Sequence, residues 1–343
     1  MTNSIKTEWL AIHLYYNAPW ERFLIHAVKP FIDTVRNHPQ VQGYFFIRYG
    51  EMGPHIRLRF KGESDYLINQ LKPLAEESFL AYMEAHPSKD LPKTDIPKFS
   101  YKEKLFPNNS IQWIEYEPEI DRYGGKKAIS LAESHFQSSS EAVLLNLEAQ
   151  TDSWSYESAM GVAIQMHLGF SYAVGMSQVE MYFFYTRLFQ TWFPSTYYYQ
   201  TENRDTHLEK VKETILESFK TSFQHQKAVI LPHVQHLWEY LHASEAQMEE
   251  RWFTLWVSQG RKVDRDMKTL ISRKDLIIPS YFLSSMDASG IDRPEFFVYE
   301  SFFHMTNNRL GIQNQDEGFL AYVLMESLDE IFTQSVGKHP GVY

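Results

Sequence analysis

The stretch that most constrains the fold of this chain is residues 55–61, which read His-Ile-Arg-Leu-Arg-Phe-Lys. Successive side chains of a β-strand point to opposite faces of a sheet. A strand here would have one apolar face (Ile56, Leu58 and Phe60) and one face with up to four cationic groups (His55, Arg57, Arg59 and Lys61). Like charges on that face would lie only ~7 Å apart and repel one another. The row is therefore either the solvated face of an edge strand or a face that meets anionic groups.

The predicted elements around this strand follow the order of a ferredoxin-like unit. Apolar, aromatic-rich runs predict strands, and Asn, Ser and Pro signals mark the ends of two helices. The expected order is strand (9–16), helix (17–37), strand (41–49), strand (55–61), helix (64–85) and strand (110–117). This order predicts an antiparallel sheet with one layer of helices. We expect the cationic row on the face that those helices leave uncovered.

The remainder of the chain, from Lys126 to the C-terminus, has an almost continuous helical pattern. Loops are predicted at Pro194 with the tyrosines that follow it, and across residues 279–294. We therefore predict an α+β fold, in which a ferredoxin-like region (1–125) precedes a mostly helical region (126–343) that packs over the sheet. We expect the two regions to form one integrated domain with the functional site between them.

The composition excludes several classes of function. The 343 residues carry a net charge of −10, whereas an extended nucleic-acid footprint requires clustered Lys and Arg. The absence of cysteine excludes disulfides, thiol catalysis and Cys-based zinc sites. The sequence has no apolar signal core and no run approaching the ~20 apolar residues of a membrane helix. We therefore expect a cytoplasmic protein with no membrane segment and no direct contact with nucleic acid.

A second stretch, residues 116–125, ends in Arg-Tyr-Gly-Gly and leads into the helical region. The paired glycines indicate a tight backbone turn before a helix. Glu119 and Arg122 lie three residues apart at this junction. They are either the solvated charges of a capping loop or part of a site.

A third stretch, residues 303–311, reads Phe-His-Met-Thr-Asn-Asn-Arg-Leu-Gly. On a helix, His304, Asn307 and Asn308 share a face, and Gly311 is the expected stop. A single helical histidine is more often structural or solvated than catalytic. His233 and His236 have a spacing that two metal ligands could use, but no HExxH or comparable signature supports a metal site.

Taken together and in this order, the three stretches resemble the C-terminal, glutamate-elimination domain of LanB-type lanthipeptide dehydratases. The same domain occurs alone in split dehydratases and in thiopeptide pathways, as the thiopeptide-type bacteriocin biosynthesis domain. The resemblance covers nearly the whole chain. It rests on HIRLRF after a Gly-Pro turn, on YEPEIDRYGG and on HMTNNRLG, of which RYGG in its setting is the most specific.

The resemblance implies a reaction and its partners. In split systems a partner protein uses glutamyl-tRNA to glutamylate Ser or Thr of a precursor peptide. The elimination domain then removes glutamate and leaves dehydroalanine or dehydrobutyrine. The expected partners are the precursor peptide, with its leader and core, and the glutamylating protein; a homodimer is one expected assembly. The step needs a positioned base for the Cα proton and preorganised arginines for the developing charge, and no metal or organic cofactor is expected.

The resemblance also implies roles for particular residues. Arg57 and Arg59 would hold the glutamyl carboxylate and stabilise negative charge, and Arg122 would do so from the loop after the last strand. His304 would transfer protons, since histidine changes charge near neutral pH. Glu119 would orient an arginine or shuttle a proton. Four further residues complete the expected site as substrate-binding or supporting groups: His55, Tyr123, Asn308 and Arg309.

Three alternatives remain open from the sequence. Relatives with the same fold in thiopeptide pathways form a pyridine ring by a formal [4+2] cycloaddition and then release the leader peptide. Those relatives tend to lose the arginine and histidine set that this sequence keeps, which favours elimination. A protein that binds the precursor peptide without catalysis is the second alternative, and an α+β protein of unrelated function is the third.

Overall fold

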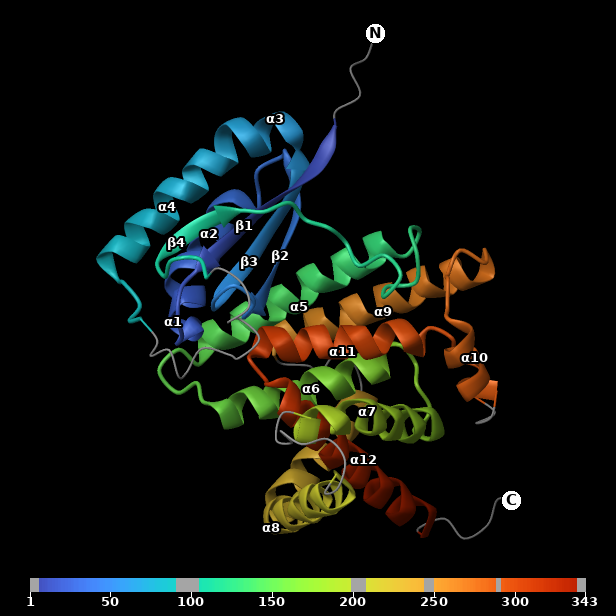
Figure 1. Ribbon diagram of the computed structural model, residues 1–343. Helices are drawn as coiled ribbons and strands as arrows, with labels where there is room; N and C mark the ends of the chain where they lie inside the picture. Colours follow the sequence, from blue (N-terminus) through green and yellow to red (C-terminus); the bar gives the residue numbers. More distant parts are fainter. Residues whose placement is uncertain (1–5, 91–104, 199–207, 244–249, 288–290, 338–343) are drawn as a thin grey trace. The chain divides into compact units, whose positions relative to one another are not determined.

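The computed structural model describes residues 6–90, 105–198, 208–243, 250–287 and 291–337 (Figure 1). The chain divides into two compact units. Unit 1 comprises residues 1–120 and 129–154, and unit 2 comprises residues 121–128 and 155–343. The predicted fold class is confirmed, because a small antiparallel sheet precedes a mostly helical region.

Unit 1 is built on a four-stranded antiparallel sheet with the strand order β2-β3-β1-β4. This order confirms the ferredoxin-like arrangement. The strands are β1 (Thr7–Tyr15), β2 (Val41–Tyr49), β3 (His55–Glu63) and β4 (Ser110–Trp113). β3 lies between β1 and β2, so it is an interior strand, and Arg57 has His13 and Ile47 as its cross-strand neighbours. The cationic row therefore does not belong to an edge strand.

Two interrupted helices cover one face of the sheet. The first runs through α1 (Trp20–Phe23), the π-turn η1 (Leu24–Val28) and α2 (Lys29–Val35), and the second through α3 (Ser64–Tyr66), η2 (Leu67–Leu71) and α4 (Lys72–Ala85). Each π-turn immediately precedes a Lys-Pro pair, where proline lacks the N–H of a regular helical turn. The apolar side chains of β3 face these helices, with the rings of Phe60 and Phe31 5.7 Å apart.

One long helix, α5 (Ile129–Ala149), packs against β2 in the same unit. Ser140 Oγ accepts from the backbone N–H of Phe46 at 3.1 Å, and Gln137 accepts from that of Tyr44 at 3.3 Å. The rings of Phe45 and Phe136 lie 5.3 Å apart. β2 is an edge strand, so its outer N–H groups have no neighbouring strand to bond, and Ser140 and Gln137 accept from two of them instead. The second face of the sheet is thus partly covered by the helical half of the sequence, rather than left free.

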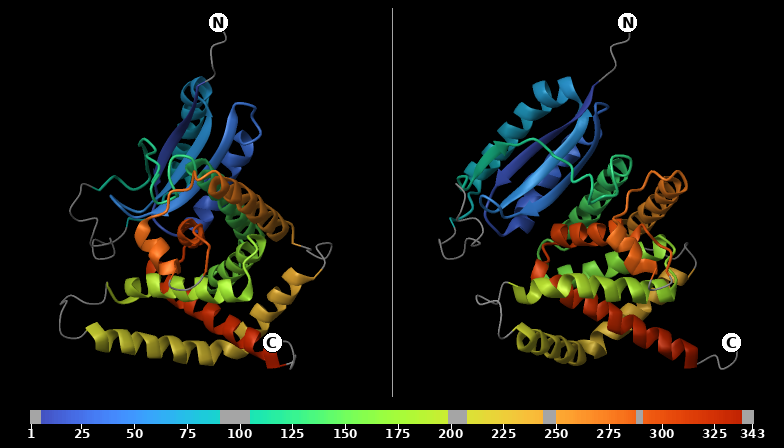
Figure 2. Two further views of the ribbon diagram at one scale, coloured as in Figure 1. Left: turned by 90° about the vertical axis from the view of Figure 1, so that its right-hand side faces the viewer. Right: turned by 45° about the vertical axis from the view of Figure 1, so that its right-hand side comes forward.

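Unit 2 is helical. Its elements are α6 (Tyr156–Ala173), α7 (Gln178–Tyr198), α8 (Leu208–His242), α9 (Arg251–Ser272), α10 (Ser280–Asp287), α11 (Phe296–Leu310) and α12 (Asn314–Gly337). α12 packs along α7 and also contacts α8, as Figure 2 shows. No helix in the described ranges is long and apolar enough to cross a membrane.

Two predicted loops of this unit were wrong. α7 continues through Pro194 to Tyr198, and residues 280–287 of the second loop form α10. α12 approaches the last turns of α7 closely at Gly318, where an added Cβ would lie 3.1 Å from Cα of Phe193. We attribute the continuation of α7 to this packing, which compensates for the hydrogen bond that Pro194 cannot donate.

Candidate functional site

The cationic face of β3 carries Arg57 in an enclosed setting within unit 1. Its guanidinium carbon lies 3.5 Å from the centre of the Tyr49 ring, and its Nε donates to Nε2 of His55 at 3.1 Å. Glu51 Oε2 lies 3.7 Å from one of its terminal nitrogens. The side chain is 17% exposed. Arg57 is therefore held in one orientation by an aromatic ring and an acceptor, and it keeps an exposed edge for an anion.

His55 is buried and supports Arg57. Its ring stacks on Tyr15 at 4.4 Å and on His13 at 4.9 Å, and Nδ1 donates to the carbonyl of Gly53 at 2.8 Å. Burial, together with the charges of Arg57 and Arg59 and against the hydrogen bond to Gly53, lowers the pKa of His55 to about 4. His55 is thus neutral at physiological pH, which leaves Nε2 as the acceptor for Arg57. The row then has three cations and not four.

The other two cations of the row have different surroundings. The guanidinium of Arg59 lies 4.4 Å from the ring centre of Tyr116 and 5.1 Å from that of Phe45. Lys61 instead pairs with Glu133 of α5 at 3.1 Å, with both groups in unit 1. Lys61 therefore has a carboxylate partner on α5, and an aromatic ring lies against each of the two arginines.

Glu119 belongs to the same unit and lies near Tyr49, the ring that covers Arg57. Burial raises the pKa of the Tyr49 hydroxyl, and the charge of Glu119 contributes to that shift. Glu119 itself is exposed. The structure therefore brings His55, Arg57, Arg59 and Glu119 together within unit 1.

In unit 2, the Arg-Tyr-Gly-Gly stretch packs against the middle of α11. Arg122 Nε donates to Oγ of Ser301 at 3.2 Å, and the buried ring of Tyr123 stacks on Phe302 at 6.2 Å. Gly124 has φ of +83°, and a Cβ there would lie 2.5 Å from Leu276. The backbone N–H of Ile277 bonds the Gly124 carbonyl at 2.9 Å. The two glycines thus allow the close approach that places Arg122 on α11.

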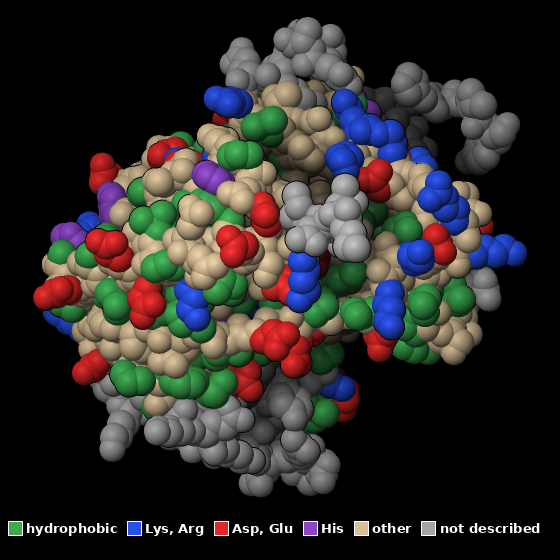
Figure 3. Space-filling view, turned by 90° about the horizontal axis from the view of Figure 1, so that it is seen from above, with side chains coloured by type: hydrophobic (Ala, Val, Ile, Leu, Met, Phe, Trp, Pro, Cys, Tyr) green, Lys and Arg blue, Asp and Glu red, His purple; other side chains and the backbone are tan. Residues whose placement is uncertain are grey.

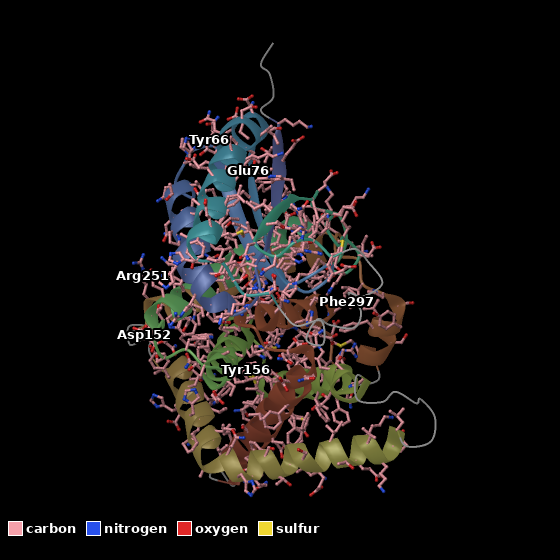
Figure 4. The ribbon with its side chains drawn as sticks, turned by 60° about the vertical axis from the view of Figure 1, so that its left-hand side comes forward. Tyr66, Glu76, Asp152, Tyr156, Arg251 and Phe297 are labelled. Carbon is pink, nitrogen blue, oxygen red and sulfur yellow. The ribbon has the colours of Figure 1, made fainter. Side chains whose placement is uncertain are left out.

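α11 is buried on every side except one stripe. The partly exposed positions recur at helical spacing along a single face, and they are Phe297, Glu300, Ser301, His304 and Asn308. Figure 4 labels Phe297 on this helix. Arg122 joins the stripe through Ser301, which lies three residues before His304. We call these five positions, together with Arg122, the α11 stripe.

His304 is the proton-transfer candidate of this stripe. Its Nδ1 lies 3.0 Å from each carboxylate oxygen of Glu317, which is in the first turn of α12. The His304 side chain is 24% exposed, whereas that of Glu317 is 4% exposed. Asn307 donates to Glu317 at 3.0 Å, and its amide oxygen lies 2.9 Å from Nε2 of the buried His167. His304 is therefore tied to a buried carboxylate on one side and accessible on the other.

The remaining predicted residues differ in exposure. Asn308 is part of the α11 stripe. Arg309 is fully buried and donates to the carbonyl of Met305 in its own helix at 2.7 Å. This contact gives Arg309 a role in supporting α11. The structure thus brings Arg122, Tyr123, His304, Asn308 and Arg309 together within unit 2.

Three residues near these groups were not identified from the sequence. Glu317 and Ser301 contact His304 and Arg122, and Glu300 lies on the α11 stripe beside Arg187 of α7, to which it is ion-paired. Burial raises the pKa of Glu300 to about 7, although Arg187 opposes the shift. Ser301 and Glu300 could have been found from their i, i−3 and i, i−4 spacing to His304. Glu317 could not have been found in this way, because the turn at Gly311 separates it from His304 and places the two residues on different helices.

The described residues contain no cluster of three His, Asp or Glu side chains that could hold a metal ion. His233 and His236 instead line a cavity of about 240 Å³ in unit 2, with Gln165, Leu237, Tyr240, Glu250 and Phe253. On the face shown in Figure 3, Lys and Arg side chains stand beside Asp and Glu side chains.

Comparison with known proteins identifies the family. The fold is α+β, with a candidate anion-binding group of residues in unit 1 and a candidate acid–base group in unit 2. A family model described as the C-terminal region of lantibiotic biosynthesis dehydratases matches residues 9–328. The chain therefore belongs to this family, which confirms the resemblance seen in its motifs.

One curated relative and several solved structures are similar. The subtilin biosynthesis protein SpaB of Bacillus subtilis is 31% identical over 137 residues, which make up 40% of this chain and 11% of SpaB. The pyridine synthase TbtD from thiomuracin biosynthesis aligns with a TM-score of 0.74 at 14% identity, over 95% of this chain and 99% of TbtD. The lantibiotic dehydratase MibB from Microbispora sp. 107891, described as tRNA-dependent, aligns with a TM-score of 0.59 at 18% identity. That match covers 98% of this chain and 29% of MibB. These structures show a shared fold.

Proposed function

We propose that this protein is a lyase that eliminates glutamate from glutamylated Ser or Thr residues of a precursor peptide. A base removes the Cα proton of the modified residue, and a double bond forms between Cα and Cβ. The Cβ–O bond breaks, and its electron pair leaves with the glutamate carboxylate. The products are glutamate and dehydroalanine from Ser, or dehydrobutyrine from Thr. Every step is a proton transfer or a heterolytic bond cleavage, so the reaction needs no oxidant or reductant.

The observation that carries the proposal is the placement of His304 on the α11 stripe. Its Nδ1 donates to the buried carboxylate of Glu317 at 3.0 Å. Arg122 donates to Ser301, which lies one turn before His304 on α11. An exposed imidazole whose far nitrogen is bound by a carboxylate can give or take a proton at the near nitrogen. An arginine beside it can stabilise the negative charge that forms as the proton leaves.

The arginines of β3 supply the second requirement of this reaction, which is a site for the departing carboxylate. Arg57 is oriented by His55 and by the Tyr49 ring, and Arg59 by Tyr116 and Phe45. Guanidinium groups fixed in this way bind carboxylates in two-pronged contacts and lose little freedom when they do so. We propose that Arg57 and Arg59 bind the glutamyl group and stabilise its carboxylate, with Glu119 and His55 supporting them.

The proposal includes two partners. The substrate is a precursor peptide with a leader and a core, and the glutamyl ester is made by a separate activity that uses glutamyl-tRNA. The name of the similar dehydratase MibB describes it as tRNA-dependent, and this chain aligns with 29% of MibB, so we assign the glutamylating step to a part outside the aligned region.

The test is to incubate the purified protein with a glutamylated precursor peptide and to follow the peptide mass. The proposal predicts a product lighter than the unmodified peptide by one water, and free glutamate. Arg59→Gln and His304→Gln should leave the glutamylated peptide intact. Lys61→Gln, which removes a cation from the same strand face, is the matched control and should retain activity. Unchanged elimination by the first two variants would contradict the proposal.

A pyridine synthase is the second candidate, because the fold of TbtD matches this chain over nearly the full length of both. The same experiment distinguishes the two reactions. A synthase would act on a peptide that already contains dehydroalanines, release the leader and leave a ring, while the glutamylated peptide stayed unchanged. A protein that only binds the peptide would produce neither mass change.

A further inference from the structure

We propose that Glu317 is the positioning residue of His304, and that buried hydrogen bonds from His167 through Asn307 to Glu317 fix which ring nitrogen of His304 faces a substrate. The inference rests on the proposed function, in which His304 transfers a proton. It adds the groups that set the tautomer of the ring.

The direction of each hydrogen bond follows from the chemistry of Glu317. An ionised carboxylate only accepts, so the Asn307 atom that bonds it at 3.0 Å must be the amide nitrogen. The amide oxygen of Asn307 then faces Nε2 of His167, at 2.9 Å. Because that oxygen also only accepts, Nε2 of His167 must carry a proton.

The protonation state of His167, the first residue in this series of hydrogen bonds, is fixed by its burial. Its ring is buried, with the Phe303 ring 4.3 Å away, and burial lowers its pKa to about 3. The ring is therefore neutral and holds its single proton on Nε2. Nδ1 of His167 has no hydrogen-bond partner among the described residues, as expected of an unprotonated nitrogen in apolar surroundings.

The same reasoning determines the tautomer of His304. Nδ1 lies 3.0 Å from both oxygens of Glu317, so it must donate, and a neutral His304 carries its proton on Nδ1. Nε2 then has the free lone pair and can act as a base; after it takes a proton, it can act as an acid. The carboxylate side chain is 4% exposed, and a buried charge acts on its neighbour more strongly than a solvated one.

The turn between α11 and α12 produces this contact. Gly311 ends α11 with φ of +87°, which reverses the chain, and α12 begins at Asn314. Glu317 therefore lies in the first turn of α12 and faces back toward His304 of α11. The neighbouring Asp316 has a separate partner, because it accepts from the hydroxyl of Tyr156 at 2.5 Å. Tyr156 is labelled in Figure 4.

The test combines the substitution Glu317→Gln with nitrogen NMR of the histidine rings in the resting protein. Gln removes the charge and places an amide N–H against Nδ1 of His304. We expect the wild-type ring to be protonated on Nδ1, and the variant to populate the Nε2–H form. The single-turnover elimination rate should fall by about 10²-fold or more, while peptide affinity stays within about threefold. Asp316→Asn, which removes the adjacent charge from the same helical turn, should alter neither measurement.

Two results would overturn the inference: a wild-type His304 protonated on Nε2, or a Glu317→Gln variant that loses activity with an unchanged tautomer. The wild-type spectrum decides the question even if the variant does not fold. If the tautomer shifts as expected but the wild-type protein eliminates no glutamate, the proposed function fails and the positioning role stands.

Discussion

Two histidines in the candidate site residues, His55 in unit 1 and His304 in unit 2, have opposite surroundings. His55 is buried between aromatic rings, and its two ring nitrogens bond Gly53 and Arg57. His304 has one nitrogen bonded to a buried carboxylate and a ring that is 24% exposed. The same residue type is therefore a neutral support in one unit and a proton-transfer candidate in the other.

The charged groups of the two units differ in the same way. On β3, an aromatic ring lies against each arginine, Tyr49 against Arg57 and Tyr116 against Arg59, and the carboxylate of Glu51 lies 3.7 Å from Arg57. In unit 2, Glu300 of α11 is ion-paired with Arg187, and Glu317 of α12 accepts a hydrogen bond from His304, so each of these carboxylates has a partner. Under the proposed function, unit 1 supplies anion-binding groups and unit 2 supplies the proton-transfer group.

The largest effect is expected from His304→Gln, which removes the proton-transfer group and keeps a polar side chain of similar size. The elimination rate should fall by about 10² to 10⁴-fold, the range for loss of a general acid or base. Mass spectrometry of a glutamylated peptide measures this directly. The matched change His55→Gln should leave the rate within about tenfold, and equal losses in the two variants would remove the distinction between the histidines.

The next effect is expected from Arg59→Lys, which keeps the charge but loses the planar group between Tyr116 and Phe45. Lysine cannot bind a carboxylate in two-pronged fashion or stack in the same manner, so kcat/KM should fall by about 10²-fold. Steady-state kinetics with the glutamylated peptide test this. Activity equal to that of the wild type would show that a positive charge alone suffices on β3.

A smaller effect, on stability, is expected from the neutral state of His55. Its pKa is about 4 in the folded protein and ~6.5 when unfolded, so the unfolded chain binds more protons between these values. The free energy of unfolding should therefore rise with pH across this window and fall on acidification. Between pH 7.5 and pH 5, His55 should contribute a loss of roughly 2 kcal/mol.

The measurement is urea unfolding at the two pH values, followed by tryptophan fluorescence, for the wild type and His55→Gln. His13 also has a depressed pKa, of about 3, so the variant should keep part of the pH dependence. A pH dependence identical in the two proteins would show that folding does not lower the pKa of His55, and the burial of its ring in the neutral form would then be wrong.

The smallest effect is expected from Glu133→Gln, which breaks the pair with Lys61 at the far end of the row. The Lys61 side chain is 33% exposed, so the loss of stability should be below about 1 kcal/mol. The elimination rate should change by less than about twofold. A large loss of activity would extend the functional part of the row to Lys61.

The sequence was sufficient for the outline of unit 1. Alternation over residues 55–61 predicted the two faces of β3, and the order of strands and helices predicted the sheet topology. These features depend on local periodicity, which a sequence displays directly. The continuation of α7 past Pro194 was not predicted, because it depends on packing against α12.

The details of the candidate site depended on tertiary structure. A strand pattern cannot show that His55 lies between Tyr15 and His13, and its neutral state follows from that burial. His304 and Glu317 lie on different helices, on either side of the turn at Gly311, so their contact could not be predicted from a helical spacing in the sequence. Alternation identified the positions of the charges, whereas their protonation states depended on the neighbours that the fold supplies.

The most direct test of the central claim is a single-turnover reaction with a precursor peptide that is glutamylated on Ser and deuterated at Cα of that residue. The account predicts that the wild-type protein forms dehydroalanine, releases glutamate, loses the Cα deuterium and reacts more slowly than with the protonated peptide. His304→Gln should leave the deuterium and the ester in place. An intact glutamyl ester after incubation with the wild-type protein, or elimination at an unchanged rate by His304→Gln, would contradict the account.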